Sequence, residues 1–387
     1  MKYNDKRTTD IRTTREVRIG TLRIGSGHPI AVQSMCATRT QDIPETLKQI
    51  QLLESHGADL IRIAIDSKKD VDALREIRKE TTARLVVDLQ ESYRLVEQVA
   101  PCVDKIRYNP GHLHHHQKSV SVSDKVKFIV DHAGAENCAV RIGVNFGSLD
   151  PSQKEHCDDP LEAAIQSAEE HLEIMETLQF DQFVVSLKSS DPNRVVEINR
   201  RFHDRHPLVP IHLGVTEAGM LPMGEIKTRV AFENLIPFGV GDTIRVSLTL
   251  PFDEKFREIT VGKAIIQDIA NGRYRSVPQF EQQGLNIISC PSCSRVENTA
   301  FIELAAKVRE VTQFAADRNI TIAVMGCRVN GPGETDHADL GLWCAPNHVN
   351  LKKRSELLGT FSYDEIVPRL LEEVKSLIGQ ESSLSSQ

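Results

Sequence analysis

The chain has 387 residues, with 47 Lys and Arg against 54 Asp and Glu, and its formal net charge at pH 7 is −7. This acidic balance argues against a general electrostatic attraction to nucleic acid. Hydrophobic residues make up 40% and charged residues 26% of the chain, as is usual for a globular protein. No stretch has the roughly 18 uncharged apolar residues of a membrane span, and the charged N-terminus is unlike a secretory signal. We therefore expect a cytoplasmic protein.

Short β-branched runs alternate with helical patterns up to about residue 275. Candidate strands occur at 28–35, 59–65, 84–89, 105–109, 139–145, 182–188, 210–216 and 242–248. Strands that alternate with helices indicate βαβ units and a parallel sheet. Eight such units fit a TIM (β/α)8 barrel better than an open sheet, so we predict a barrel domain over residues 1–275.

The pattern changes after residues 276–283, a polar segment that we interpret as a linker. Strands are expected at 284–289 and 321–326, and helices near 297–317 and 363–378. This predicts a second, smaller α/β domain over residues 284–380, followed by a polar tail at 381–387.

Four of the predicted barrel strands place an arginine between bulky apolar neighbours. These are Arg62, Arg107, Arg141 and Arg245. Because side chains alternate along a strand, the arginines should face the barrel interior. A buried guanidinium is costly unless it is paired, and its planar fork suits phosphate oxygens. We therefore expect a phosphate or diphosphate ligand.

Other polar residues cluster at the C-terminal ends of the predicted barrel strands, where TIM barrels have their active sites. They are Asp66, Asp88, Asn109, Asn145, Lys188, Thr216, Glu217 and Ser247. The acids offer an alternative, in which each arginine pairs with a carboxylate inside the barrel. That alternative stays open for any single arginine, but the acids are too few to pair with all four.

Three cysteines in the second domain have a spacing typical of a metal centre. Cys290 and Cys293 form a C-x-x-C turn after one predicted strand, and Cys327 follows the next. In a reducing compartment, clustered thiols bind metal more often than they form disulfides. The fourth ligand could be Cys344, giving a four-cysteine zinc or electron-transfer site, or Glu334, giving an iron with an exchangeable position. The spacing leaves both open.

The remaining cysteines and the histidine-rich segment are expected to have no metal role. Cys36, Cys102, Cys138 and Cys157 are scattered and are interpreted as small hydrophobic residues. The histidines of residues 112–116 cannot easily all face one ion, so a solvated loop is the preferred interpretation.

Several segments together resemble the (E)-4-hydroxy-3-methylbut-2-enyl diphosphate synthase family of the methylerythritol phosphate pathway. They are PIAVQSM, ADLIRIAI, IRYNPG, VRIGVNFGSL, FDQFVVSLKSSD, HLGVTEAG, GVGDTIRVSL, CPSCSR and MGCRVNGPGE. They occur in the family's order over nearly the whole chain, and the length suits the two-domain bacterial form.

The resemblance implies a TIM barrel that binds a diphosphate and a C-terminal domain that holds one [4Fe–4S] cluster. The implied cluster ligands are Cys290, Cys293, Cys327 and Glu334. The implied substrate-binding residues are Arg62, Arg107, Arg141, Lys188 and Ser247, with Asn109, Asn145 and Arg245 beside them. Asp88 and Glu217 fall on acidic positions important for turnover, and Glu217 could protonate the departing hydroxyl group.

The implied reaction is a two-electron reduction of 2-C-methyl-D-erythritol 2,4-cyclodiphosphate to hydroxymethylbutenyl diphosphate, with loss of water. The resemblance also implies flavodoxin or ferredoxin as electron donor and a head-to-tail homodimer.

The chain departs from the family's pattern at two places. Cys36 and Ala37 stand where the family usually has threonine and asparagine. Gln90 and Glu91 stand where a histidine and a phenylalanine are common. Gln90 can form hydrogen bonds but cannot carry a proton at neutral pH, so one assisting contact is in doubt.

Two other functions remain as alternatives to the reductase. A non-redox iron–sulfur hydratase acting on a phosphorylated substrate would turn over without a reductant. A phosphate-binding module with a four-cysteine zinc site that includes Cys344 would be colourless and would keep its metal without Glu334.

Overall fold

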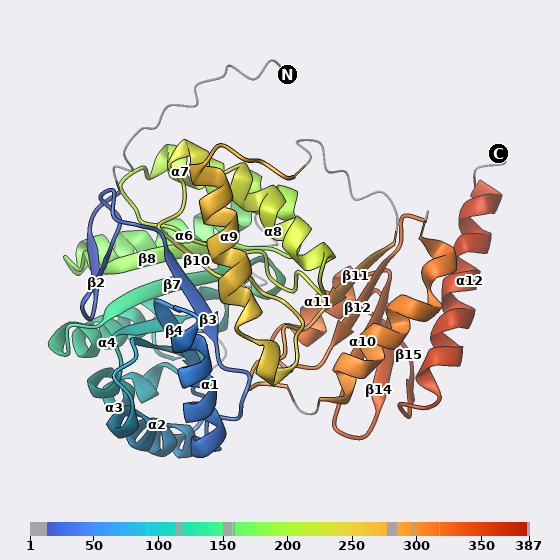
Figure 1. Ribbon diagram of the computed structural model, residues 1–387, viewed down its shortest axis with the longest axis horizontal. Coiled ribbons are helices and arrows are strands. Elements are labelled where there is room, and N and C mark those ends of the chain that lie inside the picture. The colour runs from blue at the N-terminus through green and yellow to red at the C-terminus, as the bar shows by residue number, and fades with distance from the viewer. Residues whose placement is uncertain are drawn as a thin grey trace. The chain divides into compact units, whose positions relative to one another are not determined.

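The computed structural model describes residues 14–90, 92–113, 117, 119–149, 157, 159–276, 285–296, 299–316 and 318–384. They divide into two compact units (Figure 1). The first holds the described residues up to Thr216, together with Glu225–Ser247 and those from Phe252 to Ser276. The second holds Glu217–Gly224, Leu248–Pro251 and the described residues from Leu285 onward. No helix in the described part of the chain is long and apolar enough to cross a membrane.

The first unit is built on a parallel eight-stranded sheet, which confirms the predicted barrel. In chain order the strands are β3 (Ala31–Met35), β4 (Leu60–Ala64), β5 (Leu85–Gln90), β6 (Lys105–Tyr108), β7 (Ala139–Asn145), β8 (Phe183–Lys188), β9 (His212–Leu213) and β10 (Thr243–Ile244). Their spatial order is β8-β7-β6-β5-β4-β3-β10-β9. A parallel bridge between Val185 and Ile211 joins the two ends of this sheet.

All eight predicted strands are present, but β9 and β10 are much shorter than the sequence pattern suggested. The residues after them leave the regular ladder, although the Arg245 N–H still donates to the Leu213 carbonyl at 3.0 Å. Residues 217–224 and 248–251 then join the second unit. The apolar sequence runs at 210–216 and 242–248 are therefore longer than β9 and β10, because their last residues lead into segments that belong to the second unit.

An N-terminal hairpin packs on the apolar layer at the start of the barrel strands. It consists of β1 (Val17–Ile19) and β2 (Leu22–Ile24), which pair antiparallel. Its residues Val17, Ile19 and Ile24 form one buried cluster with first residues of barrel strands such as Ala31 and Ala139. This hairpin was not predicted. Its apolar residues close the end of the barrel at which the strands begin.

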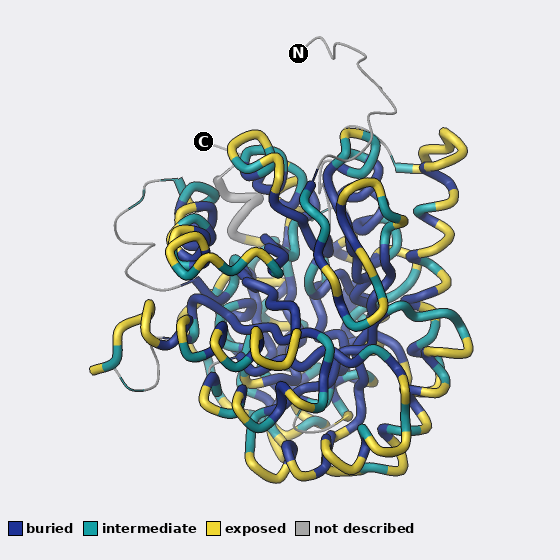
Figure 2. Tube along the Cα trace, turned by 90° about the vertical axis from the view of Figure 1, so that its left-hand side faces the viewer, coloured by how far each residue is buried: buried dark blue, intermediate teal, exposed yellow. Residues whose placement is uncertain are grey.

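Helices cover the outside of the barrel. They are α1 (Ile43–Ser55), α2 (Lys68–Glu80), α3 (Val96–Val99), α4 (Val122–Ala135), α6 (Pro160–Thr177), α7 (Pro192–Arg205), α8 (Met223–Glu233) and α9 (Arg257–Ala270). In α2, Val71, Leu74 and Ile77 are buried at helical spacing, and Ser67 caps the helix by accepting from the Asp70 N–H. Figure 2 shows the buried inner chain and the exposed outer turns.

The second unit is a five-stranded mixed sheet with three helices. Its strands, adjacent in chain order, are β11 (Asn286–Ser289), β12 (Thr321–Met325), β13 (Leu340–Cys344), β14 (Val349–Lys353) and β15 (Glu356–Phe361). The helices are α10 (Ala300–Val311), α11 (Gly331–His337) and α12 (Ile366–Leu384). β11, β12 and β13 are parallel, whereas β14 and β15 are antiparallel.

Parts of the predicted second domain differ from the structure. β13, β14, β15 and α11 were not predicted, and α12 continues to Leu384, into the expected polar tail. Apart from Ser276, the expected linker at 276–283 lies outside the described residues, as do residues 385–387 of the tail.

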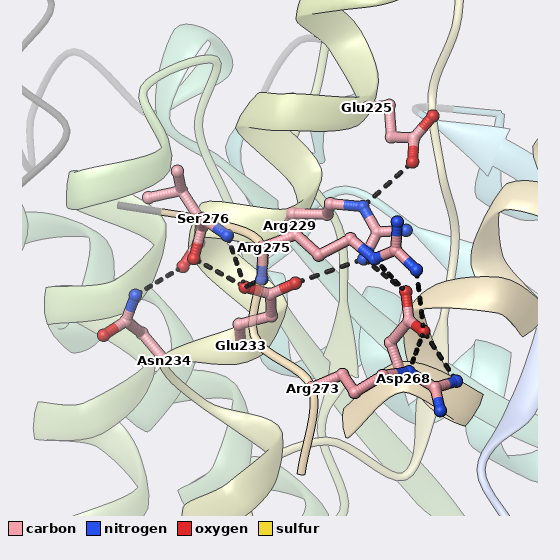
Figure 3. A network of polar contacts seen from close by, with 9 residues as sticks. Glu225, Arg229, Glu233, Asn234, Asp268, Arg273, Arg275 and Ser276 are labelled. Atoms are coloured by element: carbon pink, nitrogen blue, oxygen red, sulfur yellow. Dashed lines mark hydrogen bonds and ion pairs between the residues drawn. The ribbon is translucent and has the colours of Figure 1, made fainter. Parts of the chain in front are cut away.

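A buried ionic network holds the last described residues of the first unit against α8 and α9 (Figure 3). Arg229 donates to Glu225 at 2.9 Å, to Glu233 at 3.2 Å and to Asp268 at 3.0 Å. Glu233 also accepts from the backbone N–H groups of residues 275 and 276, at 2.9 and 2.7 Å. Burial opposes ionisation of Asp268, but hydrogen bonds from the surrounding arginines outweigh it and hold its pKa below the usual value. The network therefore fixes the end of the first unit.

We expect Arg229→Met to lower the free energy of unfolding by about 2 kcal/mol, because the buried acids lose a shared cation. The loss stays moderate since Arg273 and Arg275 still contact Asp268. Denaturant unfolding, followed through the transition in which the first unit unfolds, measures this loss. The control is Arg257→Met, whose exposed side chain pairs only with Glu254 among the ion pairs described. If Arg229→Met and Arg257→Met were equally stable, the ionic network would not stabilise the first unit.

Candidate functional site

The barrel strands bring a group of cations into the interior. Arg62 lies on β4, Arg107 on β6 and Arg141 on β7, and all are at least nine-tenths buried. Arg107 pairs directly with Arg141 in the strand register. Arg245, just after β10, and Lys188, the last residue of β8, are also buried. The predicted convergence of these side chains is therefore present, because every second residue of a barrel strand faces inward.

Two carboxylates face these cations. Asp88 Oδ1 accepts from Arg107 Nη1 at 2.9 Å, and its Oδ2 lies 3.8 Å from Arg62 Nε. Glu258 Oε2 lies 3.8 Å from Arg245 Nε. Of the acids proposed from the sequence, Asp88 thus pairs with two arginines at once. Glu258 was missed because it comes from α9, where nothing in the sequence distinguishes it from a surface acid.

The described residues compensate the charge of Arg141 poorly. Its Nε and Nη1 atoms are buried without a hydrogen-bond partner among the described residues, and so are Nε and Nη2 of Arg245. Burial, together with Arg62, Arg107 and Arg245, holds the pKa of Arg141 well below its usual value. Burial and Arg141 likewise lower the pKa of Lys188. An anion bound here would relieve these costs.

A further interior cation was missed. Lys105 lies two residues before Arg107 on β6, so it shares the same inward face, and it is fully buried. Burial and the neighbouring Arg141 and Arg62 hold its pKa well below the usual value. The sequence could have predicted this interior position, because a residue two positions before Arg107 on the same strand faces the same side.

Glycines make room for two of the cations. A Cβ on Gly143 would lie 2.1 Å from Arg107 Nε, and Arg107 Nη2 donates to the Gly143 carbonyl at 2.7 Å. A Cβ on Gly214 would lie 2.8 Å from Lys188 Nζ. A side chain at either position would displace a cation from the interior.

The three uncharged site residues differ in what they can offer a ligand. Asn109 Nδ2 donates to Gln90 and to Ser148, and its Oδ1 accepts from the Gly111 N–H. Asn145 Oδ1 accepts from the Gly147 N–H at 3.2 Å. Ser247 is buried two residues after Arg245. Asn109 is thus engaged within the protein at every polar atom.

In the second unit, the ends of two parallel strands bring Cys290 and Cys327 together. Cys290 follows β11, and its N–H donates to the Val324 carbonyl of β12 at 3.2 Å. The two thiols share a hydrogen bond, which lowers the pKa of Cys327 below its usual value and raises that of Cys290. N–H groups of Val329 and Asn330 also favour the Cys327 thiolate. Cys293 is close enough to Cys290 to affect its ionisation.

The loop that follows β10 supports the cysteine turn. Thr249 Oγ1 lies 2.6 Å from Ser289 Oγ and donates to the Cys290 carbonyl at 3.1 Å. Ser292, in a left-handed conformation with φ of 48°, donates from its hydroxyl to the Leu250 carbonyl at 3.0 Å. These bonds fix the C-x-x-C turn from outside its own sheet.

Glu217 and Glu334 are both connected to Asn330, a residue that the sequence analysis did not single out. Asn330 Nδ2 donates to Glu217 Oε1 at 3.0 Å, and its carbonyl accepts from the Glu334 N–H at 2.9 Å. Glu217 belongs to the second unit although it follows β9, and its φ is 48°. Asn330 therefore connects the predicted acid, the predicted fourth ligand and the Cys327 loop.

The residues of this unit have the donor chemistry that an iron–sulfur cluster requires. Three buried thiols and a buried carboxylate come from two neighbouring loops, and backbone N–H groups favour one thiol as thiolate. Within the described residues, no three His, Cys, Asp or Glu side chains are arranged to hold a single metal ion. Each cysteine of a [4Fe–4S] cluster binds a different iron, so its ligands do not converge on one point.

None of the contacts just described involves Cys344. It ends β13 next to Tyr363, and burial raises the pKa of its thiol to about 12. Cys36 is an equally buried thiol with a pKa of about 12. Of the histidine-rich segment, His112 ends a short 3-10 helix at 110–112, while residues 114–116 lie outside the described part.

The fold and the two sites define a class: a TIM-barrel protein with a cation-rich interior and an attached thiol-rich domain. Comparison with known proteins identifies the family. Residues 14–263 match the GcpE TIM-barrel domain, and residues 286–376 match the GcpE protein C-terminal domain. The chain belongs to this family, as its sequence motifs indicated.

Curated relatives match over nearly their whole length. One from Rhodopirellula baltica, named 4-hydroxy-3-methylbut-2-en-1-yl diphosphate synthase (flavodoxin), is 61% identical over 94% of this chain and 96% of its own. A protein of the same name from Nautilia profundicola is 38% identical over 94% of this chain and 97% of its own. Another protein of this name, from Caldicellulosiruptor saccharolyticus, is 36% identical over 94% of this chain and 99% of its own.

We expect Arg141→Met to raise the dissociation constant for inorganic pyrophosphate about thirtyfold, because charge-assisted hydrogen bonds to the anion are lost. The thermal midpoint of the ligand-free protein should not fall, since an uncompensated buried charge is removed. Calorimetric titration and thermal unfolding measure the two effects. Arg75→Met, on an exposed pair with Asp72, is the control. Unchanged pyrophosphate affinity would exclude Arg141 from the anion site.

Proposed function

We propose that the protein is an oxidoreductase that converts 2-C-methyl-D-erythritol 2,4-cyclodiphosphate to (E)-4-hydroxy-3-methylbut-2-enyl diphosphate in isoprenoid precursor biosynthesis. The observation that carries this proposal is the family match over both domains, on a chain whose barrel interior has cations in excess of carboxylates. A flavodoxin is the proposed electron donor, as the relatives' names suggest. We also propose a cytoplasmic homodimer.

The barrel cations would bind the diphosphate. Arg141 and Arg245 have buried N–H groups without a hydrogen-bond partner in the described chain. Lys188 ends β8, which pairs with the Arg141 strand β7, and Ser247 lies two residues after Arg245. Together with Arg62 and Arg107 they would stabilise negative charge on the diphosphate oxygen as its bond to carbon breaks. Asn145 would contribute its amide N–H groups, whereas the amide of Asn109 is engaged within the protein.

The second unit would hold the redox group. Cys290, Cys293, Cys327 and Glu334 are the proposed ligands of a [4Fe–4S] cluster, which when bound supplies electrons one at a time. Glu217 would deliver the proton that the departing hydroxyl group needs to leave as water. Asn330 positions Glu217 by donating to one of its carboxylate oxygens.

The first test is metal content and the visible spectrum of protein purified without oxygen. Wild type should be brown with about four irons per chain, and Glu334→Ala should change the cluster spectrum because one iron loses its ligand. Glu303→Ala, in an exposed position on α10, is the control. Colourless zinc-bearing protein from an iron-replete preparation, unaffected by Glu334→Ala, would overturn the reductase proposal.

Turnover of the cyclodiphosphate with a one-electron reductant tests the role of Glu217. We expect Glu217→Gln to lower kcat about a hundredfold, with KM changed by less than about threefold, because a general acid is lost while the diphosphate contacts remain. The cluster spectrum checks that the metal centre is intact, and the exposed Glu173→Gln is the control. Turnover without reductant would instead indicate a hydratase.

A further inference from the structure

Gln90 occupies a strained position at the end of β5. Its φ of 49° is left-handed, which is uncommon for a residue with a side chain. The pairing of β5 with β6 shifts register between Asp88 and Gln90. Gln90 is nevertheless buried, at 9% exposure, and its side chain contacts Asp88. Local strain of this kind persists where surrounding contacts compensate for it.

The Gln90 amide bridges two predicted site residues. Its Nε2 donates to Asp88 Oδ2 at 3.2 Å, and its Oε1 accepts from Asn109 Nδ2 at 3.3 Å. The bridge needs one donor and one acceptor on the same side chain. A neutral amide always provides both.

The bridge extends into a longer chain of hydrogen bonds. Arg107 Nη1 donates to the other oxygen of Asp88 at 2.9 Å, and Asn109 Nδ2 also donates to Ser148 at 2.9 Å. Asp88 is therefore held from β6 on one side and by Gln90 on the other. Both N–H groups of Asn109 are used within the protein, which leaves them unavailable to a substrate.

We propose that Gln90 is a positioning residue, whose uncharged donor–acceptor bridge between Asp88 and Asn109 fixes the Asp88 carboxylate for turnover. The proposal rests on the proposed function. It implies that position 90 needs a hydrogen-bond donor and acceptor and does not need to transfer a proton. The histidine common in the family at this position would then fulfil the same role only in its neutral form.

Two substitutions separate bridging from proton transfer. Gln90→Leu removes both hydrogen bonds, so kcat should fall about tenfold with KM changed by less than about threefold. Gln90→His keeps one donor and one acceptor while the imidazole is neutral, and loses the acceptor when it is protonated. The charged group that contacts position 90 is Asp88 on β5. Asp88 is in turn surrounded by Arg62 on β4 and Arg107 on β6, and it acts electrostatically on Arg141 on β7.

The experiment measures kcat and KM from pH 5.5 to 8.5 for wild type, Gln90→Leu and Gln90→His, with the cluster content of each. Above the imidazole pKa, followed by histidine NMR, Gln90→His should be within about threefold of wild type. The ratio of its kcat to that of wild type should fall as the imidazole becomes protonated. Gln179→His, at an exposed left-handed position with φ of 54°, should follow wild type throughout.

The outcomes distinguish this proposal from the proposed function. Wild type that does not reduce the cyclodiphosphate would overturn the proposed function and this inference with it. Two results with active wild type would overturn the inference alone. One is an unchanged kcat in Gln90→Leu; the other is a ratio of Gln90→His kcat to wild-type kcat that does not change as the imidazole becomes protonated. An unchanged thermal midpoint in Gln90→Leu, together with the loss in kcat, shows that the effect is on turnover and not on folding.

Discussion

The barrel interior buries more cations than carboxylates, and the free-energy cost of doing so is the main constraint on this structure. Arg141 and Arg245 keep buried N–H groups unsatisfied within the described chain, and Lys105 lies fully buried below them. Isolated charges in a low-dielectric interior are strongly unfavourable. The apolar floor formed by the β1–β2 hairpin and the helices outside must offset that cost. An anion bound in this interior would recover part of that cost.

Chain continuity explains how residues of one predicted strand end come to serve different units. Thr216 belongs with the barrel, whereas Glu217, the next residue, groups with the second unit and accepts from Asn330. The segment after β10 does the same, since Thr249 bonds to the Cys290 carbonyl. The loop after β9 thus places Glu217 beside Asn330, and the loop after β10 places Thr249 beside the cysteine turn. The early ends of β9 and β10 are a requirement of this arrangement.

The sequence predicted what strand alternation and motif spacing determine directly. Each of the four arginines of the barrel strands stood between two bulky apolar residues. The ends of β11 and β12 placed Cys290 and Cys327 together as parallel strands require. Glu258 and Asn330 could not be found in this way, because their roles depend on tertiary packing of a helix and a loop. The β1–β2 hairpin escaped because two three-residue strands are too short to give a periodic signal. The pairing of Asp88 with two arginines also needed the register of β4, β5 and β6.

Gln90 shows why a departure from a family pattern has to be evaluated in its contacts. Compared by residue type alone, glutamine in place of histidine removes a proton carrier from the site. The structure shows instead an amide that donates to Asp88 and accepts from Asn109, the same pair of bonds that a neutral imidazole offers. A glutamine provides this bridge at every pH, whereas a histidine provides it only above its own pKa. Substitution at this position would therefore change the pH range over which Asp88 and Asn109 are bridged, and it would leave proton supply to the proposed acid Glu217.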